Sequence, residues 1–515
     1  MSLPMRTPEF LTMQSVTAYF RDLCLQRIDS LLAEPLPCDP VSMLRLEELF
    51  LAAGRHIADL LTAAALFQVH LDPRFCKQAI SEARRVREPQ VELPLKSKGR
   101  PQRLVQLRGG LVLPIKTPYL SPDRADCPGR PRGWGKRGPE GVGALPVLEA
   151  LGITYGVTPA TRSEISRQLV VCSSYKECLE HLKREGLEID SMTMVNVALD
   201  TGNKAIELRD LRLAKARSEP LGEDSLVAGQ RVRISTDGGR AQTRRTLRGP
   251  GYRPGANGRR PIETSWREPR IITIDLLDES GEVLSTFKPI YEVTLGNADE
   301  VFNILTGLLR LIGIHKAKEV LLISDGADWI WDRWDLLIKE CELEAKKVHR
   351  VLDFYHAAEH VSEALKACKS LDQEAREKLC GSLRSKLKDV GGPEAVIAEL
   401  RGLAQGRQAE EVGKEIKHLE KHLEHMNYAG LRALNLPIGS GVVESAVRRV
   451  INLRFKSAGQ FWLEENLGPL MYLRAIVKSG RWESFMVSWL EGRHWLERGG
   501  DFNGRVPVTS SREAA

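Results

Sequence analysis

The sequence predicts an α/β protein in which a sheet-containing region follows two helical regions. After residue 225, short runs rich in Val, Ile and Leu alternate with stretches whose apolar residues have helical spacing. The order strand, strand, strand, helix, strand, helix, strand and then helices is typical of a sheet with helical connections. Residues 9–90 and 145–205 have helical periodicity instead, and only 103–120 between them has the pattern of a β-hairpin.

Length and composition restrict the class of protein. The 515 residues are enough for about three domains, and 42% hydrophobic and 28% charged residues exclude a disordered or fibrous chain. The net charge of +7 is mild for this length, and the nine cysteines contain no CxxC pair, which favours reduced thiols. The chain starts without a secretory signal, and the most apolar stretch, 57–71, contains Asp59, Gln68 and His70. We therefore expect a soluble, cytoplasmic protein without a membrane span.

The N-terminal half divides into three predicted regions. Residues 1–100 are a helical N-terminal region, and 101–144 combine a hairpin around Gly109-Gly110 with a linker rich in Gly, Pro and Arg. Residues 145–215 contain three short helices with a tight turn before the last one, the pattern of a helix-turn-helix DNA-binding domain. An ordinary small helical bundle would have the same spacing, so both interpretations stay open on the pattern alone.

The C-terminal half is predicted to be one α/β domain with a helical interruption. Its first part covers 225–355, a helical insertion covers 356–428, and the second part covers 429–490 before a C-terminal tail at 491–515. The strand ISTDGG ends at Asp237, a later apolar strand ends at Asp325, and the last helix, which carries Glu444, begins after the GSG segment at 439–441.

These three acids are the strongest candidates for chemistry. In α/β sheets, functional groups collect at the carboxyl ends of strands, where Asp237 and Asp325 lie, while Glu444 is in the first turns of a helix with Ser440 as its expected N-cap. Carboxylates are hard oxygen ligands that suit Mg²⁺ or Mn²⁺. Two such ions roughly 3.5–4 Å apart can activate a water or a 3′-hydroxyl at a phosphodiester.

Each acid alone also has a structural explanation. An Asp-Gly pair after a strand is ordinary turn chemistry, and Glu444 is spaced to pair with Arg448 at i+4. The functional interpretation depends on the combination of the three acids and on their order.

Five blocks of the chain carry a resemblance to a known family. In order they are STDGGR, WREPRIITIDLLDESG, SDGADWIW, VLDFYHAAEH and IGSGVVESAVRRV. Together they resemble the DDE transposases of bacterial insertion sequences, in particular the ISKra group, which is related to the Mutator-like transposases. The resemblance is dense over about residues 230–480 and extends to the helix-turn-helix at 145–205.

The resemblance implies an RNase H-like catalytic domain that is interrupted by the all-helical insertion and preceded by the two helical regions. It implies that Asp237, Asp325 and Glu444 bind the divalent metals that cut and join DNA. The family's D-x-x-H signature matches Asp353 and His356, which are then expected to support the site. Without the family, these two residues have the pattern of a helix-start Asp and a packed His beside Tyr355.

Cofactor and partners follow from the same resemblance. The expected cofactor is Mg²⁺, with Mn²⁺ as a substitute and no organic cofactor. The expected partner is double-stranded DNA, namely the terminal inverted repeats of the element and the target DNA, with no membrane involved. Because two element ends must be cut and joined together, a homodimer or larger homo-oligomer, associated with the nucleoid, is expected.

Two possible zinc or metal motifs are not favoured. Relatives often carry a cysteine-bearing, zinc-ribbon-like element after the hairpin, but only Cys127 remains in that stretch, so structural zinc is not expected there. His418, His422 and His425 share one helical face at i, i+4 and i+7, yet Leu419 stands where a HExxH motif requires Glu. Alternating Lys, Glu and His favours a solvated helix face.

Positive charge is concentrated beside the first acid. The segment 239–270, called the arm below, contains nine Arg, no Lys and only two acids, so its charge equals the surplus of the whole chain. Such an arm fits phosphate contacts, and its Tyr252 and Trp266 could stack on bases; a disordered loop is the alternative. In the helix after Glu444, the apolar positions Val443, Val447, Val450 and Ile451 are expected to face inward. The predicted DNA-binding residues are Arg240, Arg244, Arg245, Arg248, Arg253, Arg259, Arg260, Arg448 and Arg449.

Two other functions remain compatible with the sequence. A transposase-derived DNA-binding protein that no longer catalyses would keep the helix-turn-helix, although the presence of all three acids weighs against it. An RNase H-like nuclease without strand transfer would leave the helix-turn-helix without a purpose. The DDE transposase is the interpretation that uses all of these features.

Overall fold

A computed structural model describes residues 12–92, 94–122, 143–247, 251–253, 260–369, 371–405, 408–456 and 459–497. Its contacts divide the chain into unit 1, Met1–Asp200, and unit 2, Thr201–Ala515. Each unit has its own buried apolar core. The boundary lies inside one long helix, whereas the sequence suggested a boundary near residue 215.

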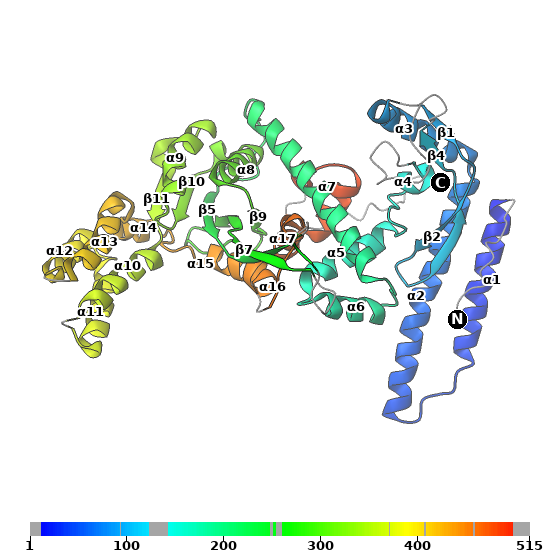
Figure 1. The fold of residues 1–515 in the computed structure, drawn as a ribbon, viewed down its shortest axis with the longest axis horizontal. Coiled ribbons are helices and arrows are strands. Elements are labelled where there is room, and N and C mark those ends of the chain that lie inside the picture. Colours follow the sequence, from blue (N-terminus) through cyan, green and yellow to red (C-terminus); the bar gives the residue numbers. More distant parts are fainter. Residues whose placement is uncertain are drawn as a thin grey trace. The chain divides into compact units, whose positions relative to one another are not determined.

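Unit 1 begins with three helices, of which the first two lie side by side (Figure 1). The second helix begins with a capping box: the Asp39 carboxylate accepts from the backbone N–H of Ser42, whose hydroxyl accepts from the N–H of Asp39. Four short strands follow and form two antiparallel pairs: β2 and β3 make a hairpin, and β1 pairs with β4 on either side of it in the sequence. The elements are α1 Met13–Leu32, α2 Pro40–Leu71, α3 Pro73–Val91, β1 Leu95–Ser97, β2 Gln102–Gln106, β3 Val112–Lys116 and β4 Leu120–Pro122.

The predicted hairpin around Gly109-Gly110 is β2 and β3, and its turn is fixed to α2. The buried Asp59 carboxylate accepts from the backbone N–H groups of Gly109 and Leu111, both at 2.8 Å. Gly110 has a φ of 107°, and a side chain there would collide with the backbone of Gly186. A glycine at this turn is therefore required twice, by conformation and by space.

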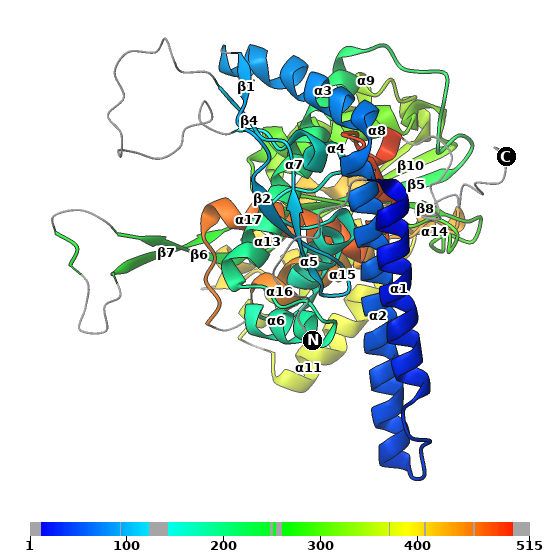
Figure 2. The same ribbon diagram turned by 90° about the vertical axis from the view of Figure 1, so that its right-hand side faces the viewer.

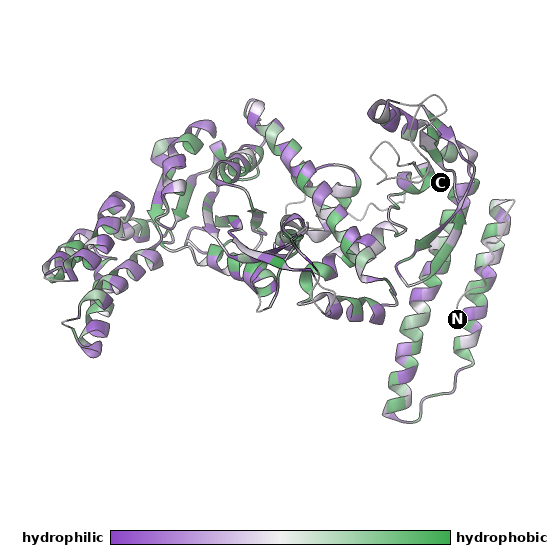
Figure 3. Cartoon of the chain, viewed as in Figure 1, coloured by the Kyte–Doolittle hydropathy of each residue, from purple (hydrophilic) through white to green (hydrophobic). Residues whose placement is uncertain are grey.

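By length and composition, α2 is the one described helix that is apolar enough to cross a membrane, with a mean hydropathy of 1.4 and 28% of that window buried. Figure 3 shows the hydrophobic residues along it. Its polar residues Asp59 and His70 are nevertheless buried, and His70 is hydrogen-bonded to Thr117 of the segment after β3 at 3.1 Å. These two residues therefore pack inside unit 1, although most of the apolar window is not buried. A cytoplasmic location stays a prediction.

The helices predicted for the helix-turn-helix have the expected start signals. Thr158 and Ser174 accept hydrogen bonds from the backbone three residues further on, and Asp190 accepts from Met192 and Thr193 in the same way. The fully buried Arg162 forms an ion pair with Asp200 at 2.7 Å and thereby joins the second helix to the last one. The helices are α4 Pro146–Ala150, α5 Pro159–Val171, α6 Tyr175–Arg184 and α7 Ser191–Ser218.

Unit 2 is built on a five-stranded mixed sheet with the order β11-β10-β5-β8-β9. The first strand, β5, lies at its centre. On one side β8 pairs antiparallel with β5 and β9 pairs antiparallel with β8, whereas on the other side β10 and β11 lie parallel to β5. Buried Val, Ile and Leu residues fill these strands, as expected for a sheet covered on both faces. The strands are β5 Arg231–Gly238, β8 Arg270–Leu277, β9 Ile290–Thr294, β10 Glu319–Ser324 and β11 Val348–Leu352.

The arm is an antiparallel hairpin between β5 and β8. Its strands are β6 Ala241–Thr246 and β7 Ile262–Arg267, and Figure 2 shows that they project away from the rest of unit 2. Backbone hydrogen bonds tie its base to Trp462: the N–H of Arg244 donates to the Trp462 carbonyl at 2.8 Å, and the N–H of Trp462 donates to Gln242 at 3.0 Å. The described part of the arm is thus ordered β-structure.

Helices surround the sheet and form the predicted insertion. Helix α15 packs on β5 and β8, α17 packs on β9, and α8 packs on β8. The insertion lies beyond the β11 edge, where its apolar residues and those of β10 and β11 share one core (Figure 1). The helices are α8 Ala298–Leu311, α9 Asp328–Glu340, α10 Phe354–Ala367, α11 Gln373–Lys386, α12 Gly392–Leu403, α13 Ala409–Lys421, α14 Tyr428–Ala433, α15 Gly441–Ala446, α16 Leu453–Phe455, α17 Glu464–Lys478 and α18 Trp482–Leu490.

One buried ion pair links the two central antiparallel strands. Arg233 of β5 and Asp275 of β8 are direct cross-strand neighbours, and an Arg233 Nη lies 2.5 Å from an Asp275 Oδ. Both side chains are almost fully buried. Removing one partner of such a pair leaves an uncompensated charge in the core, at a cost of roughly 3–5 kcal/mol.

We therefore expect Asp275→Ala to lower the free energy of unfolding by about 3–5 kcal/mol, because Arg233 stays buried and charged. The double variant Arg233→Met/Asp275→Leu removes both charges and should be close to neutral. Urea unfolding followed by tryptophan fluorescence measures the free energy of unfolding of both variants, since all but one of the nine tryptophans lie in unit 2. Equal losses in the single and double variants would contradict the prediction.

Candidate functional site

Three aspartates end three neighbouring parallel strands in matched register. Thr236 of β5 pairs with Ser324 of β10, and Ser324 pairs with Leu352 of β11. The residues that follow them along the chain are Asp237, Asp325 and Asp353. Because neighbouring strands are about 4.8 Å apart and the register matches, the three aspartates form a row at one edge of the sheet.

Asp237 lies at one end of this row, on the central strand of the sheet. Its carboxylate accepts from the backbone N–H of Gly238 at 2.6 Å. Burial, together with the negative charges of Asp325, Glu444 and Asp353, raises the pKa of Asp237 to about 6. A positive charge bound here would relieve this repulsion.

Asp325 lies in a turn that is held in place from the next helix. One of its carboxylate oxygens accepts from the backbone N–H of Ala327 at 3.1 Å, which leaves the second oxygen available to a ligand. The indole N–H of Trp331 in α9 donates to the Asp325 carbonyl at 2.8 Å. A side chain on Gly326 would collide with the ring of His418, so this glycine is needed for the turn to pack.

Asp353 joins β11, α10 and the segment before α15. Its buried carboxylate caps α10 by accepting from the backbone N–H of His356 at 2.9 Å, and it also accepts from the backbone N–H of Ser440. A side chain on Gly439 would lie 2.7 Å from the Tyr355 ring, so this ring would have to move to accommodate it. Both residues of the D-x-x-H signature thus lie at the site, and Asp353 does begin a helix.

Glu444 approaches the row of aspartates from α15. The side chain of Ser440 makes no capping bond to this helix, in contrast to the expectation; its backbone carbonyl accepts the first helical bonds instead. The helix continues into a π-helical segment, Val447–Asn452, which changes the helical register behind Glu444. Among the described residues, no ion pair joins Glu444 to Arg448 or to any other cation.

One cavity of about 510 Å³ contains Asp237, Asp325, Asp353 and Glu444. His356 and Tyr355 line it from α10. The insertion also contributes two cations that the sequence patterns did not identify, Lys366 of α10 and Arg384 of α11. Lys366 pairs with Glu363 at 2.6 Å, whereas Arg384 is exposed and forms no ion pair with a described residue.

The donor set of the cavity fits hard divalent cations. All four acids offer carboxylate oxygens, the ligands that Mg²⁺ and Mn²⁺ prefer. Among the described residues, one group of three candidate ligands has donor atoms that all lie within 4.8 Å of one another, and it consists of the histidines described next. The carboxylate oxygens of the three predicted ligands are further apart than that. Mutual repulsion of the carboxylates is consistent with this wider spacing.

The prediction of a solvated helix face for the insertion histidines was wrong. The face of His418, His422 and His425 is not solvated: His422 is buried, and His425 stacks on Trp331 with ring centroids 4.3 Å apart. His418 instead lies against His360 of α10, with centroids 3.8 Å apart. Burial and the neighbouring histidines lower the pKa of His418 to about 4, so that its ring is neutral near pH 7. The helix face is covered because α13 packs on α10 within the insertion core.

The predicted DNA-binding arginines fall into three groups. The exposed ones on the described part of the arm are Arg240, Arg244, Arg245, Arg253 and Arg260, while Arg248 and Arg259 lie outside the described residues.

Behind Glu444, Arg448 is exposed, but Arg449 donates to the Tyr291 hydroxyl on β9, away from the cavity. Arg454, further along this helix, is buried against Trp462. The apolar positions Val443, Val447, Val450 and Ile451 are buried, as predicted.

Comparisons of the chain with protein-family models, with curated proteins and with solved structures gave no match. The geometry of the cavity and the motif blocks of the sequence are therefore the grounds on which a function is assigned.

The raised pKa of Asp237 predicts a pH-dependent stability effect. An unfolded Asp has a pKa of about 3.9. Above pH 6 Asp237 is ionised in both states and destabilises the fold, and below pH 4 it is protonated in both states. In the presence of a chelator, Asp237→Asn should therefore raise the free energy of unfolding by about 1–3 kcal/mol at pH 8, and the gain should vanish by pH 4.

Denaturant unfolding at a series of pH values measures this effect. Asp332→Asn is the matched control, because Asp332 is an exposed acid on α9 outside the cavity. A gain for Asp237→Asn that does not change with pH would contradict the electrostatic explanation.

Proposed function

We propose that the protein is a DDE transposase that binds the terminal inverted repeats of an insertion sequence and cuts and joins DNA strands with the aid of Mg²⁺. The observation that carries the proposal is the row of register-matched aspartates with Glu444 in the same cavity. These acids are far apart in the sequence, so only the folding of the chain can bring them into one cavity. Their order along the chain is that of the motif blocks.

The architecture of unit 2 supports an RNase H-like catalytic domain. A mixed sheet has its first strand at the centre, with an acid at the end of that strand and another at the end of the adjacent parallel strand. The helical insertion follows the third parallel strand and ends before the helix of Glu444. This arrangement agrees with the fold that the resemblance implies.

Asp237, Asp325 and Glu444 would hold the metal, with Mn²⁺ as a substitute for Mg²⁺. When bound, the ions supply an activated water or 3′-hydroxyl and stabilise the leaving oxygen of the phosphodiester. Asp353 is a positioning residue in this scheme, because it fixes the segment from which α15 begins. No organic cofactor is required by the proposed reaction.

The charged surfaces of unit 2 provide phosphate contacts on either side of the acids. The arm presents exposed arginines beside β5, and Arg384 contributes a cation from the insertion. Trp266 and Tyr252 of the arm are exposed and can stack on bases. The helices α4–α7 would recognise the inverted repeats. Since two ends must be joined, a dimer or larger assembly is expected.

Asp325→Ala should abolish cleavage and joining of DNA that carries the element ends. The loss should be at least about a hundredfold, because metal binding contributes several kcal/mol to transition-state stabilisation. Cleavage and strand-transfer products on a labelled substrate measure the effect with and without Mg²⁺. Asp332→Ala, which changes an exposed acid on the following helix, should keep full activity.

The same assay separates the alternatives. An Asp325→Ala protein that still cuts and joins DNA would contradict the assignment of Asp325 as a catalytic residue. Cleavage products without strand transfer in the wild type would indicate a nuclease, and DNA binding without either product would indicate a DNA-binding protein that no longer catalyses.

Removing arm charges should weaken DNA binding through counterion release. Arg244→Ala/Arg245→Ala is expected to reduce the slope of log K against log salt by about 1–2 and to leave the thermal unfolding temperature unchanged. Both side chains are exposed on β6. Lys346→Ala/Lys347→Ala removes two charges from the turn before β11 and is the matched control. Equal slopes for the two double variants would exclude the arm from DNA contact.

A further inference from the structure

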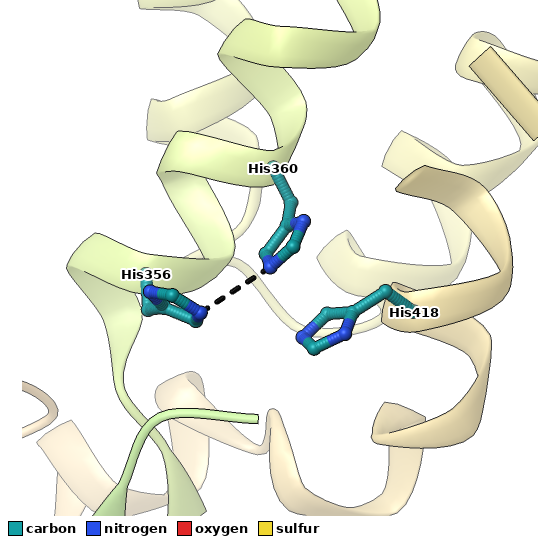
Figure 4. A group of neighbouring side chains, drawn as sticks. All are labelled: His356, His360 and His418. Carbon is teal, nitrogen blue, oxygen red and sulfur yellow. Dashed lines mark hydrogen bonds between the residues drawn. The ribbon is translucent and has the colours of Figure 1, made fainter. Parts of the chain in front are cut away.

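A group of three histidines lies beside the carboxylate cavity and is separate from its acids. His356 and His360 are one turn apart on α10, and His418 reaches them from α13 (Figure 4). One ring nitrogen of each lies within 4.8 Å of those of the other two. The cluster is partly buried. His356 belongs to the expected D-x-x-H signature, whereas His360 and His418 belong to no motif.

The spacing and bonding of the first two rings suit metal coordination. The Nε2 atoms of His356 and His360 are 3.3 Å apart. This is roughly the distance between two nitrogens of a tetrahedral zinc site with Zn–N bonds of about 2.0–2.1 Å. His360 Nδ1 lies 2.5 Å from a carboxylate oxygen of Glu415, which places the proton on Nδ1 and the lone pair on Nε2. Carboxylate–histidine pairs of this kind orient the ligands of many zinc sites.

The third ring has a buried nitrogen without a partner. His418 Nε2 is shielded from solvent and makes no hydrogen bond. Figure 4 shows the ring directed toward His356 and His360. A buried polar atom left without a partner costs about 1–3 kcal/mol. A cation in the middle of the cluster would accept this lone pair together with those of the other two rings.

We propose that His356, His360 and His418 form a site for a divalent transition metal, with Zn²⁺ as the preferred ion. Three imidazole nitrogens suit Zn²⁺ better than Mg²⁺, which prefers the oxygens of the neighbouring cavity. His356 also lines that cavity, so the two sites are neighbours. The site goes beyond the proposed transposase activity and does not depend on it.

Metal binding here would stiffen the turn that carries Asp325. The ring of His418 occupies the space that a side chain on Gly326 would need. An ion that fixes His418 to α10 therefore also fixes the turn after β10 and the junction between sheet and insertion. The histidine site would thus hold the residues of the cavity in position, and its ligands are nitrogens where those of the cavity are oxygens.

Co²⁺ is the probe for this site, because its visible absorption reports ligand number and type. The metal-free full-length protein should bind Co²⁺ at the histidines with a spectrum typical of four-coordinate nitrogen and oxygen ligands, distinct from the weak absorption of Co²⁺ at an all-oxygen site. His360→Ala and His418→Ala should each weaken binding at least tenfold and remove this spectrum. Glu415→Gln, which keeps the shape of the side chain bonded to His360 Nδ1, should weaken binding by about 10–100-fold.

Two controls locate the ion. His425→Ala changes a histidine that stacks on Trp331 outside the cluster, and it should bind Co²⁺ like the wild type. Asp325→Asn should also retain the spectrum, because the carboxylates are not ligands of this site. Zn²⁺ should raise the thermal unfolding temperature of the wild type and not that of His418→Ala.

The proposal is overturned if His418→Ala keeps the wild-type spectrum and affinity, or if Asp325→Asn removes the spectrum. If His418→Ala fails to fold, Glu415→Gln decides: unchanged Co²⁺ affinity in that variant overturns the proposal. Loss of Co²⁺ binding without any loss of DNA cleavage would support the metal site and leave the transposase activity to its own test.

Discussion

The parallel hydrogen-bond ladder from β5 through β10 to β11 is the constraint on which the rest of unit 2 depends. It sets the three strands in matched register, so Asp237, Asp325 and Asp353 leave the sheet at the same level. A shift of one residue in either pairing would turn one of these side chains to the opposite face. The helices after these strands, the cap on α10 and the approach of Glu444 all take their positions from this edge.

The edge carries more negative charge than its surroundings neutralise. The aspartates are held mainly by backbone N–H groups, from Gly238, Ala327 and Ser440 among others, rather than by neighbouring cations. The cations of the cavity come from the insertion, a separate layer of helices. Repulsion between the acids destabilises the fold, and the apolar core that the insertion shares with β10 and β11 stabilises it. Such a distribution is typical of sites that are completed by a bound cation.

Local patterns predicted the elements better than the contacts between them. The alternation of apolar runs indicated the strands that end at Asp237 and Asp325, and turn and capping residues marked the hairpin at Gly110 and the helix after Thr158. The histidine cluster was not predictable in this way. Spacing on one helix grouped His418 with His422 and His425, whereas the packing of α13 on α10, which depends on the whole insertion core, brings it to His356 and His360. The bond between Arg449 and Tyr291 is likewise a tertiary contact, which helical periodicity alone did not indicate.

The contact between Gly326 and His418 has a consequence for how this chain can change during evolution. Because the imidazole ring fills the space where a side chain at 326 would be, position 326 cannot gain a side chain while the ring stays in place. A lineage that gains a side chain beside Asp325 must first lose the ring on α13, and with it one corner of the histidine cluster. A side chain at 326 is therefore expected only in relatives that lack the ring at 418, so that variation beside the acids depends on a residue of the insertion.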